Sequence, residues 1–208
     1  MEIGTAVWIK NKHYKNDTDD LWIATSIFKK DKFEGKYYVT VTDGEGENSV
    51  YCLPQDHQEL EDLKFRNPLR SNDHSASEVE VGNLVDLPFL NEPEILFCLK
   101  RRFYKDIIYT YTGKILISIN PLREIPGLYS ENILSQFSHD VKNLSPHVWN
   151  VANNTYKNLK RRLTIYHPPE IQLPPISNFS ILISGESGSG KTESSKFILK
   201  YMIKAGKQ

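Results

Sequence analysis

One eight-residue stretch constrains the fold of this chain more than any other feature. Residues 185–192 read Gly-Glu-Ser-Gly-Ser-Gly-Lys-Thr, which is a complete G-x-x-x-x-G-K-T pattern. An apolar run at residues 179–183 precedes the pattern and predicts a buried strand. Four apolar residues after the pattern share one face of a predicted helix: Phe197, Ile198, Tyr201 and Met202. Strand, glycine loop and helix in this order predict an α/β unit that carries a phosphate-binding loop.

Each residue type in this pattern has its own chemical task. Gly185, Gly188 and Gly190 let the backbone curl so that its N–H groups converge on one anion. Lys191 adds a mobile positive charge, and the hydroxyl of Thr192 can bind Mg²⁺. The alternative interpretation is a flexible glycine turn without a ligand. The strand and helix patterns on either side favour the phosphate-binding loop.

The charge balance and the cysteine content limit the classes of partner and site. The chain carries 26 basic and 26 acidic side chains in 208 residues, so we expect no binding to nucleic acid. No apolar run reaches the roughly 20 residues that cross a bilayer, so we expect no membrane insertion, and no signal-peptide pattern follows Met1. Cys52 and Cys98 lack C-x-x-C spacing, and the six histidines form no metal motif. These features predict a cytoplasmic chain in which histidine and cysteine hold no metal.

Residues 1–60 have the pattern of a small β-barrel. Four strands are predicted from short runs of apolar and β-branched residues, at residues 6–9, 21–28, 37–41 and 49–53. Asp43-Gly44 predicts the hairpin turn between the last two strands, because glycine tolerates the positive φ of such turns. Four aromatic residues either fill the core of this barrel or form a cage that binds a cationic side chain: Trp8, Trp22, Tyr37 and Tyr38.

The middle of the chain alternates between a polar segment, a helix and a hairpin. Residues 61–80 are polar and predict a linker. Asn91 followed by Glu92-Pro93-Glu94 predicts the start of a helix. Its apolar face is predicted from Ile95, Leu96, Leu99 and Phe103. Two further runs predict a hairpin that turns at Thr112-Gly113, at residues 107–112 and 114–119.

Three further features concern a helix start, a proline-rich segment and two basic triplets. Ser145-Pro146 predicts the start of a helix, which we expect to pack on the sheet that carries the glycine loop. The proline-rich residues 167–175 are either a docking peptide or an inert surface insertion. The basic triplets at 100–102 and 160–162 either contact a polyanion or are solvated parts of helices.

The glycine loop and four other stretches resemble one protein family. Residues 185–193 read Gly-Glu-Ser-Gly-Ser-Gly-Lys-Thr-Glu and closely resemble the phosphate loop of myosins. Four stretches resemble the same family in the same order: Leu90-Asn91-Glu92-Pro93, residues 108–113, Ile119-Asn120-Pro121 and residues 145–148. The resemblance covers essentially the whole chain. It implies a mixed α/β fold with an SH3-like β-barrel at 1–60, a linker at 61–80 and the first part of a P-loop motor core at 81–208.

The resemblance also implies roles for individual residues. Asn120, Pro121 and Tyr129 would lie at the adenine side of a bound nucleotide, where a flat purine needs an apolar wall. Within the loop, the three glycines and Ser189 would approach the phosphates, and Glu186 would position the loop. The catalytic residues would be Ser187, near the γ-phosphate, and Lys191, on the β- and γ-phosphates, while Thr192 would bind Mg²⁺.

Three departures from the family pattern bear on the tightness and base preference of that site. Asn153 stands where aspartate is frequent, and the proline-rich insertion at 167–175 is unusual. Ser189, where myosins usually have alanine, is a further difference. The segment from Asn120 to Tyr129 has one more residue than in many members. Segments like N-x-N-S-S-R-F-G and D-I-x-G-F-E, which hydrolysis needs in this family, do not occur in these 208 residues.

The resemblance implies a motor, and the missing segments leave one alternative open. The first expectation is the N-terminal part of a myosin-type ATPase that uses ATP and Mg²⁺ and, in the complete protein, moves on actin filaments. Actin and light chains would bind through regions outside these residues, and the protein would belong to the cytoskeleton. The alternative is a truncated, non-hydrolysing nucleotide-binding or interaction module. A different P-loop enzyme, such as a kinase, disagrees with the four upstream stretches.

Overall fold

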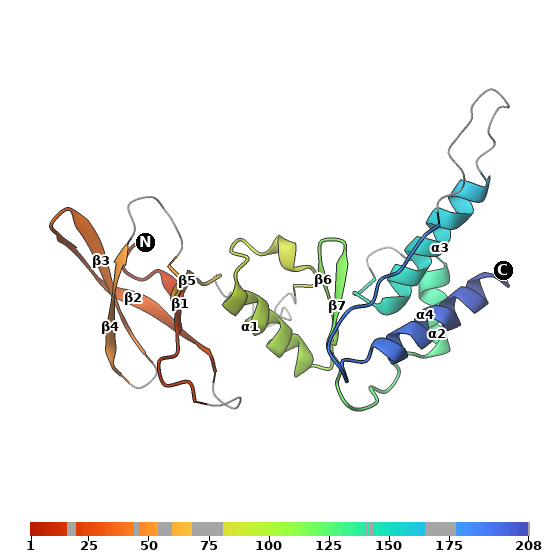
Figure 1. The fold of residues 1–208 in the computed structure, drawn as a ribbon, viewed down its shortest axis with the longest axis horizontal. Coiled ribbons are helices and arrows are strands. Elements are labelled where there is room, and N and C mark those ends of the chain that lie inside the picture. Colours follow the sequence, from red (N-terminus) through yellow and green to blue (C-terminus); the bar gives the residue numbers. More distant parts are fainter. Residues whose placement is uncertain are drawn as a thin grey trace, which may run out of the picture. The chain divides into compact units, whose positions relative to one another are not determined.

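The computed structural model describes residues 1–15, 20–43, 46–53, 60–67, 81–139, 141, 144–164 and 178–207 (Figure 1). It shows a mixed α/β fold, as the sequence predicts. The chain forms two compact units. The first comprises Met1–Val81 and Val85–Lys100, and the second comprises Gly82–Leu84 and Arg101–Gln208. A short 3₁₀ helix, η1 (Leu84–Asp86), lies at the boundary.

The first unit is built on a curled antiparallel sheet with the strand order β4-β3-β2-β1-β5 (Figure 1). The strands are β1 (Ala6–Lys10), β2 (Trp22–Phe33), β3 (Lys36–Thr42), β4 (Asn48–Leu53) and β5 (Leu63–Phe65). The first part of β2 pairs with β1 and its second part pairs with β3, with a register shift between Ile27 and Lys29. Such a bulge bends a strand and increases its twist, which curls the sheet. Six apolar residues fill its core: Val7, Ile9, Ile27, Val39, Val41 and Leu63.

The four predicted strands are present, but two predicted boundaries are wrong. The strand predicted at 21–28 continues to Phe33 and turns into β3 through Glu34 and Gly35, whose φ angles are 48° and 79°. β5 lies inside the predicted linker and pairs with β1, so the sheet extends past residue 60. The hairpin between β3 and β4 is confirmed, although Gly44 of the predicted turn lies outside the described residues. Residues 68–80 of the predicted linker lie outside them as well.

The first helix, α1 (Glu92–Phe103), is anchored to this sheet through a buried carboxylate. Asn91 caps the helix as predicted, with its Oδ1 accepting from Glu94 N at 3.2 Å. Glu94 is only 3 % exposed, and its Oε1 accepts from Trp8 Nε1 at 2.6 Å and from Asn67 N at 2.7 Å. The predicted apolar face is partly wrong, because Leu96 is exposed. The start of the helix is oriented by these polar contacts as well as by apolar packing.

We expect Glu94→Ala to destabilise the first unit by about 3 kcal/mol, because two buried donors would lose their acceptor. Hydrogen exchange of the β1 and β2 amides would measure this loss. Glu92→Ala is the control, because Glu92 is exposed in the same first turn. Its effect should stay below about 1 kcal/mol, the contribution of a charge at a helix N-terminus. Equal effects of the two substitutions would contradict the anchoring role of Glu94.

Where its residues are described, the second unit combines one hairpin with three helices. Strands β6 (Tyr109–Thr112) and β7 (Ile115–Ser118) form the predicted antiparallel hairpin, which turns at Gly113 with φ 61°. The helices are α2 (Glu131–Ser138), α3 (Val148–Thr164) and α4 (Lys191–Ala205). In Figure 1, α3 and α4 lie side by side. A shared core joins the hairpin to these helices and includes Ile108, Tyr109, Phe137, Trp149 and Tyr201.

Three predictions for this unit are wrong in part or in full. No strand is present at residues 179–183, where Leu182 is 92 % exposed, because no other described strand pairs with this run. Helix α3 packs on α4 and α2 rather than on a sheet that carries the glycine loop. It also begins at Val148 instead of Ser145. The proline-rich residues 167–175 lie outside the described residues.

The two basic triplets differ from each other. Arg102 is buried, and its guanidinium donates to Thr110 Oγ1 and to the Tyr109 carbonyl, both at 2.8 Å. It therefore fixes the hairpin and is not a solvated residue or a polyanion contact. Residues 160–162 are exposed on α3, as a solvated helix end requires. None of the helices in the described part of the chain is long and apolar enough to cross a membrane.

Candidate functional site

The glycine loop, residues 185–192, is a compact turn whose backbone conformation favours glycine at several positions. Gly188 and Gly190 adopt φ angles of 79° and 90°, which strain any residue with a side chain. A Cβ on Gly185 would lie 2.6 Å from the Ser189 hydroxyl oxygen and 3.3 Å from Ser189 Cβ, so the Ser189 side chain would have to move. Within the loop, Ser189 N donates to the Glu186 carbonyl at 3.2 Å. Ser189 is therefore part of the loop packing, and its hydroxyl faces Gly185.

Helix α4 starts directly from this loop without a side-chain cap. Gly190 occupies the cap position in a left-handed conformation, and no side chain accepts from the first turn. The first N–H groups of a helix have no partner within the helix, and its dipole makes that end positive. Lys191, the first residue of α4, donates from Nζ to the carbonyls of Gly185 and Glu186 at 2.8 and 2.7 Å. The Lys191 ammonium and the positive end of the α4 dipole therefore lie together where the loop meets the helix.

A cavity of about 340 Å³ lies beside the end of the glycine loop. The end of β7 and the segment after it supply one wall, which includes Asn120, Pro121 and Tyr129. The other wall comes from the loop and α4, and it includes Ser189, Gly190, Glu193 and Phe197. The structure therefore brings five of the predicted site residues together around one space: Asn120, Pro121, Tyr129, Ser189 and Gly190.

Asn120 connects the two walls directly. Its Nδ2 donates to the Gly188 carbonyl at 2.7 Å, although the two residues are 68 positions apart. Its Oδ1 accepts from Leu122 N at 3.0 Å, which orients the amide. The Asn120 side chain also lies 3.8 Å from the position of a Cβ on Gly190, which is van der Waals contact and shows how closely the two segments pack. Asn120 thus holds the glycine loop against the cavity segment.

Tyr129 forms a flat apolar wall that is supported by other aromatic rings. Its ring stacks on Phe197 with 3.5 Å between centroids and 11° between planes. Its hydroxyl shares a hydrogen bond of 2.7 Å with the Tyr109 hydroxyl. Burial raises the pKa of both tyrosines above the ordinary value, so both hydroxyls keep their protons at neutral pH. The hydrogen-bonded tyrosine pair and the stacked Phe197 ring therefore fix the Tyr129 ring at the cavity, and its role as a wall for a purine stays a prediction.

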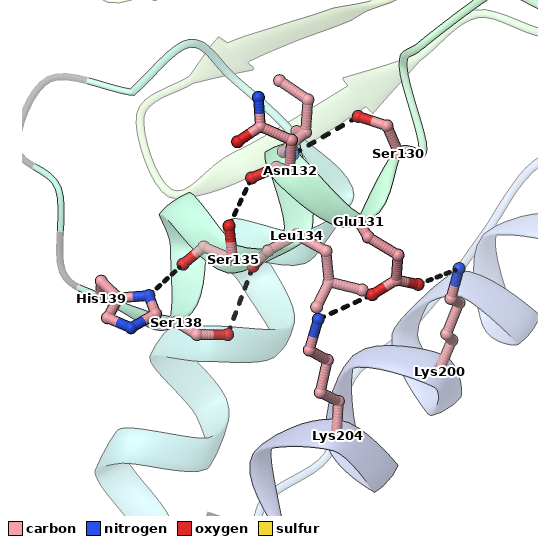
Figure 2. A network of polar contacts seen from close by, with 10 residues as sticks. Ser130, Glu131, Asn132, Leu134, Ser135, Ser138, His139, Lys200 and Lys204 are labelled. Carbon is pink, nitrogen blue, oxygen red and sulfur yellow. Dashed lines mark hydrogen bonds and ion pairs between the residues drawn. The ribbon is translucent and has the colours of Figure 1, made fainter.

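Helix α2 follows Tyr129 immediately and is tied to α4 by ion pairs (Figure 2). Ser130 caps α2, with its Oγ accepting from Ile133 N at 3.4 Å. The Glu131 carboxylate contacts Lys200 Nζ at 3.0 Å and Lys204 Nζ at 2.7 Å (Figure 2). Hydrogen bonds from Lys204 and Lys200 lower the pKa of Glu131. This network links the residue next to the cavity wall to the helix that carries Lys191.

His147 closes the other side of the Tyr129 segment. It is 4 % exposed, and its Nε2–H donates to the Leu128 carbonyl at 3.2 Å. Its Nδ1 accepts from Trp149 N at 3.1 Å, so His147 caps α3, which explains the late start of this helix. Burial lowers the pKa of His147 from 6.5 to about 4, despite the bond to Leu128, which acts in the opposite direction. The imidazole is therefore neutral at physiological pH.

We expect this buried histidine to make the second unit acid-sensitive. The unfolded chain takes up the proton near pH 6.5 and the folded chain only near pH 4, so stability falls as the pH drops through this window. The loss should approach about 3 kcal/mol and then level off. Urea unfolding between pH 7 and pH 4 would measure it. His147→Gln should flatten the slope, whereas His139→Gln, at an exposed histidine of the same unit, should not.

Other residues named from the sequence lie apart from the cavity. Ser187 and Thr192 are exposed on the loop and at the start of α4 and do not line the cavity. Asn153 is buried against a second cavity of about 200 Å³, which Asn150 and Lys157 also line. The exchange at Asn153 therefore does not alter the cavity beside the glycine loop.

Contacts between segments that are distant along the chain were not predicted from the sequence. The roles of His147 and Phe197 and the hydrogen bond from Asn120 to Gly188 become visible only when distant segments meet.

The four aromatic residues of the first unit form no common cage, because Trp8 pairs with Phe97 while Tyr37 faces Lys30 and Lys32. Elsewhere in the first unit, three exposed or half-buried side chains have possible metal-ligand atoms within 4.8 Å of one another: His13, Asp43 and Glu47. Exposed acidic groups often gather without a metal, so we assign no site to them.

Comparisons with known proteins identify the same family as the sequence motifs. Residues 81–208 match the family model described as the myosin head, or motor domain. Myosin-4 of Saccharomyces cerevisiae is 33 % identical over 207 residues, which cover 97 % of this chain. Myosin-15 of Arabidopsis thaliana is 31 % identical over 204 residues, which cover 98 %. Myosin-M heavy chain of Dictyostelium discoideum is 39 % identical over 145 residues, which cover 69 %.

The chain spans only a small part of these relatives. It covers 12 % of the yeast protein, 11 % of the plant protein and 8 % of the Dictyostelium protein. The family-model match nevertheless includes more than half of the chain, and the yeast and plant matches extend over nearly all of it. The chain therefore belongs to the myosin family, and its residues 81–208 are part of a myosin motor head.

Proposed function

We propose that this chain is the nucleotide-binding beginning of a myosin motor head. The glycine loop would hold the phosphates of MgATP, and the cavity beside it would take the adenine base. One observation carries this proposal, which is the hydrogen bond from Asn120 to the Gly188 carbonyl. It joins the predicted phosphate loop to the predicted base segment, so both parts of one nucleotide can be bound together. Tyr129 supplies the flat apolar surface that a purine needs.

The residues of the loop fit a bound triphosphate. The uncapped start of α4 offers backbone N–H groups and a positive helix end to an anion. Lys191 would exchange its bonds to the loop carbonyls for the β- and γ-phosphates, and Thr192 would bind Mg²⁺ through its hydroxyl. Ser187 would lie near the γ-phosphate, and Glu186 would position the loop. The bound Mg²⁺ would neutralise charge on the phosphate oxygens.

The two parts of the sequence would have different roles in this protein. We infer that the curled sheet of the first unit is the SH3-like barrel implied by the resemblance, extended by β5. Residues 81–208 would begin the P-loop motor core. In the complete protein, ATP hydrolysis would drive movement on actin filaments, and actin and light chains would bind through other regions. The protein would then act in the cytoplasm on the cytoskeleton.

A non-hydrolysing nucleotide-binding or interaction module is the second candidate. These 208 residues contain neither of the two segments that close over the γ-phosphate and position water in this family. Positioning and electrostatic stabilisation supply most of the rate of phosphoryl transfer. The 208 residues by themselves should therefore bind MgATP weakly and show no turnover above background.

Two measurements separate these candidates. The first is MgATP binding and ATPase activity of the 208-residue chain, by calorimetry and phosphate release. The second is the actin-stimulated ATPase rate of the protein at its native length. Actin stimulation would establish the motor, and nucleotide binding without turnover at native length would establish the module. A native-length protein that binds no MgATP would overturn both.

A further inference from the structure

His147 lies between the cavity wall and helix α3, and it contacts both through one ring. The Nε2–H group donates to the Leu128 carbonyl, directly before Tyr129 in the chain. The Nδ1 atom accepts from Trp149 N in the first turn of α3. These two bonds require one donor and one acceptor on opposite sides of the same side chain. A neutral imidazole with its proton on Nε2 meets that requirement.

The same ring fills the space behind the cavity wall. Its centroid lies 5.1 Å from Tyr109, 5.7 Å from Tyr129 and 4.8 Å from Trp149. Tyr129 in turn packs edge-on against Trp149, with 5.8 Å between the ring centroids. Close packing leaves the Tyr129 ring little room to move away from the cavity. His147 itself does not line the cavity.

The phosphate side of the candidate site has separate supports. The glycine loop is held by its own bonds, by Lys191 and by Asn120. None of these residues contacts His147 in a hydrogen bond or ring pair of the described chain. A change at His147 should therefore disturb the Tyr129 wall and leave the loop in place.

We propose that His147 is a positioning residue for base recognition, which fixes the Leu128 to Tyr129 segment so that the Tyr129 ring can stack on a purine. The inference rests on the proposed nucleotide site and deepens it, because it assigns the base and the phosphates to separately supported parts. It predicts that affinity for the base can be lost while affinity for the phosphates is kept.

The test uses two ligands that both offer phosphates, of which only one carries a base. MgADP and magnesium tripolyphosphate are titrated by calorimetry into the protein at its native length. His147→Asn keeps an acceptor near Trp149 N but cannot reach the Leu128 carbonyl. We expect it to weaken MgADP binding at least about tenfold and to change tripolyphosphate binding less than about twofold. His139→Gln should change neither affinity.

The possible results separate this inference from the proposed function. A parallel loss of both affinities, or no loss of MgADP affinity, would overturn the role of His147. A wild-type protein that binds neither ligand would overturn the proposed nucleotide site and this inference together. If His147→Asn does not unfold cooperatively, His147→Ser is titrated with the same two ligands under the same criteria, because serine also offers a cap acceptor to Trp149 N and cannot reach the Leu128 carbonyl.

Discussion

Lys191→Ala should lower the affinity for MgATP on the order of 100-fold or more. A charge-assisted hydrogen bond contributes about 1.5–3 kcal/mol, and Lys191 would make such contacts with two phosphates. In the structure its ammonium donates to the loop carbonyls of Gly185 and Glu186 at 2.8 and 2.7 Å. Any ATPase activity of the native-length protein should disappear with the same substitution, because the lysine would also stabilise charge on the transferred group.

Calorimetric titration with MgATP measures this effect, and Lys207→Ala is its matched control. Lys207 is an exposed lysine just beyond the end of α4, far along the chain from the loop. Thermal unfolding of both variants would show that the chain stays folded, since Lys191 also bonds two loop carbonyls. Unchanged MgATP affinity in Lys191→Ala would refute the placement of the phosphates in the glycine loop.

Trp149→Ala should destabilise the second unit by about 4 kcal/mol, because truncating a buried tryptophan removes its packing and leaves a cavity. Trp149 is fully buried at the start of α3, and its Nε1 donates to the Phe197 carbonyl at 3.0 Å. Phe197 stacks on Tyr129, so the substitution removes support from both walls of the candidate site. Its loss should therefore lower nucleotide affinity as well.

Urea unfolding of the second unit, followed by hydrogen exchange of the α3 and α4 amides, would measure this loss. Leu199→Ala on α4 is the control, because Leu199 is 60 % exposed. That variant should stay within about 0.5 kcal/mol of the wild type. A loss below about 1 kcal/mol for Trp149→Ala would contradict the central place of this residue in the core.

Local features of the chain could be predicted from the sequence. Asn91 caps α1, and Gly113 turns the β6–β7 hairpin, because both depend on conformations that only a few neighbouring residues decide. Asn120, Pro121 and Tyr129 were named through the resemblance to myosins, and the structure places them around one cavity with Ser189 and Gly190. Their roles toward a nucleotide stay predictions.

Errors arose where a segment depends on partners far along the chain. The run at 179–183 has the composition of a strand, but a strand forms only when another strand pairs with its backbone. Leu96 has the spacing of a buried helix residue, yet Glu94 anchors the helix to the sheet and leaves Leu96 exposed. Arg102 belongs to a basic triplet, but the hairpin that follows it buries its guanidinium.

The sequence by itself determined the position of the glycine loop, the first four strands, the β6–β7 hairpin and the family, because these follow from residue types at fixed local spacing. The tertiary structure alone decided which residues support the site. His147, Trp149 and Phe197 gather behind Tyr129 from separate segments, and Asn120 joins the loop to the cavity. Burial and hydrogen bonding between distant segments depend on the packed chain, so no local spacing of residues encodes them.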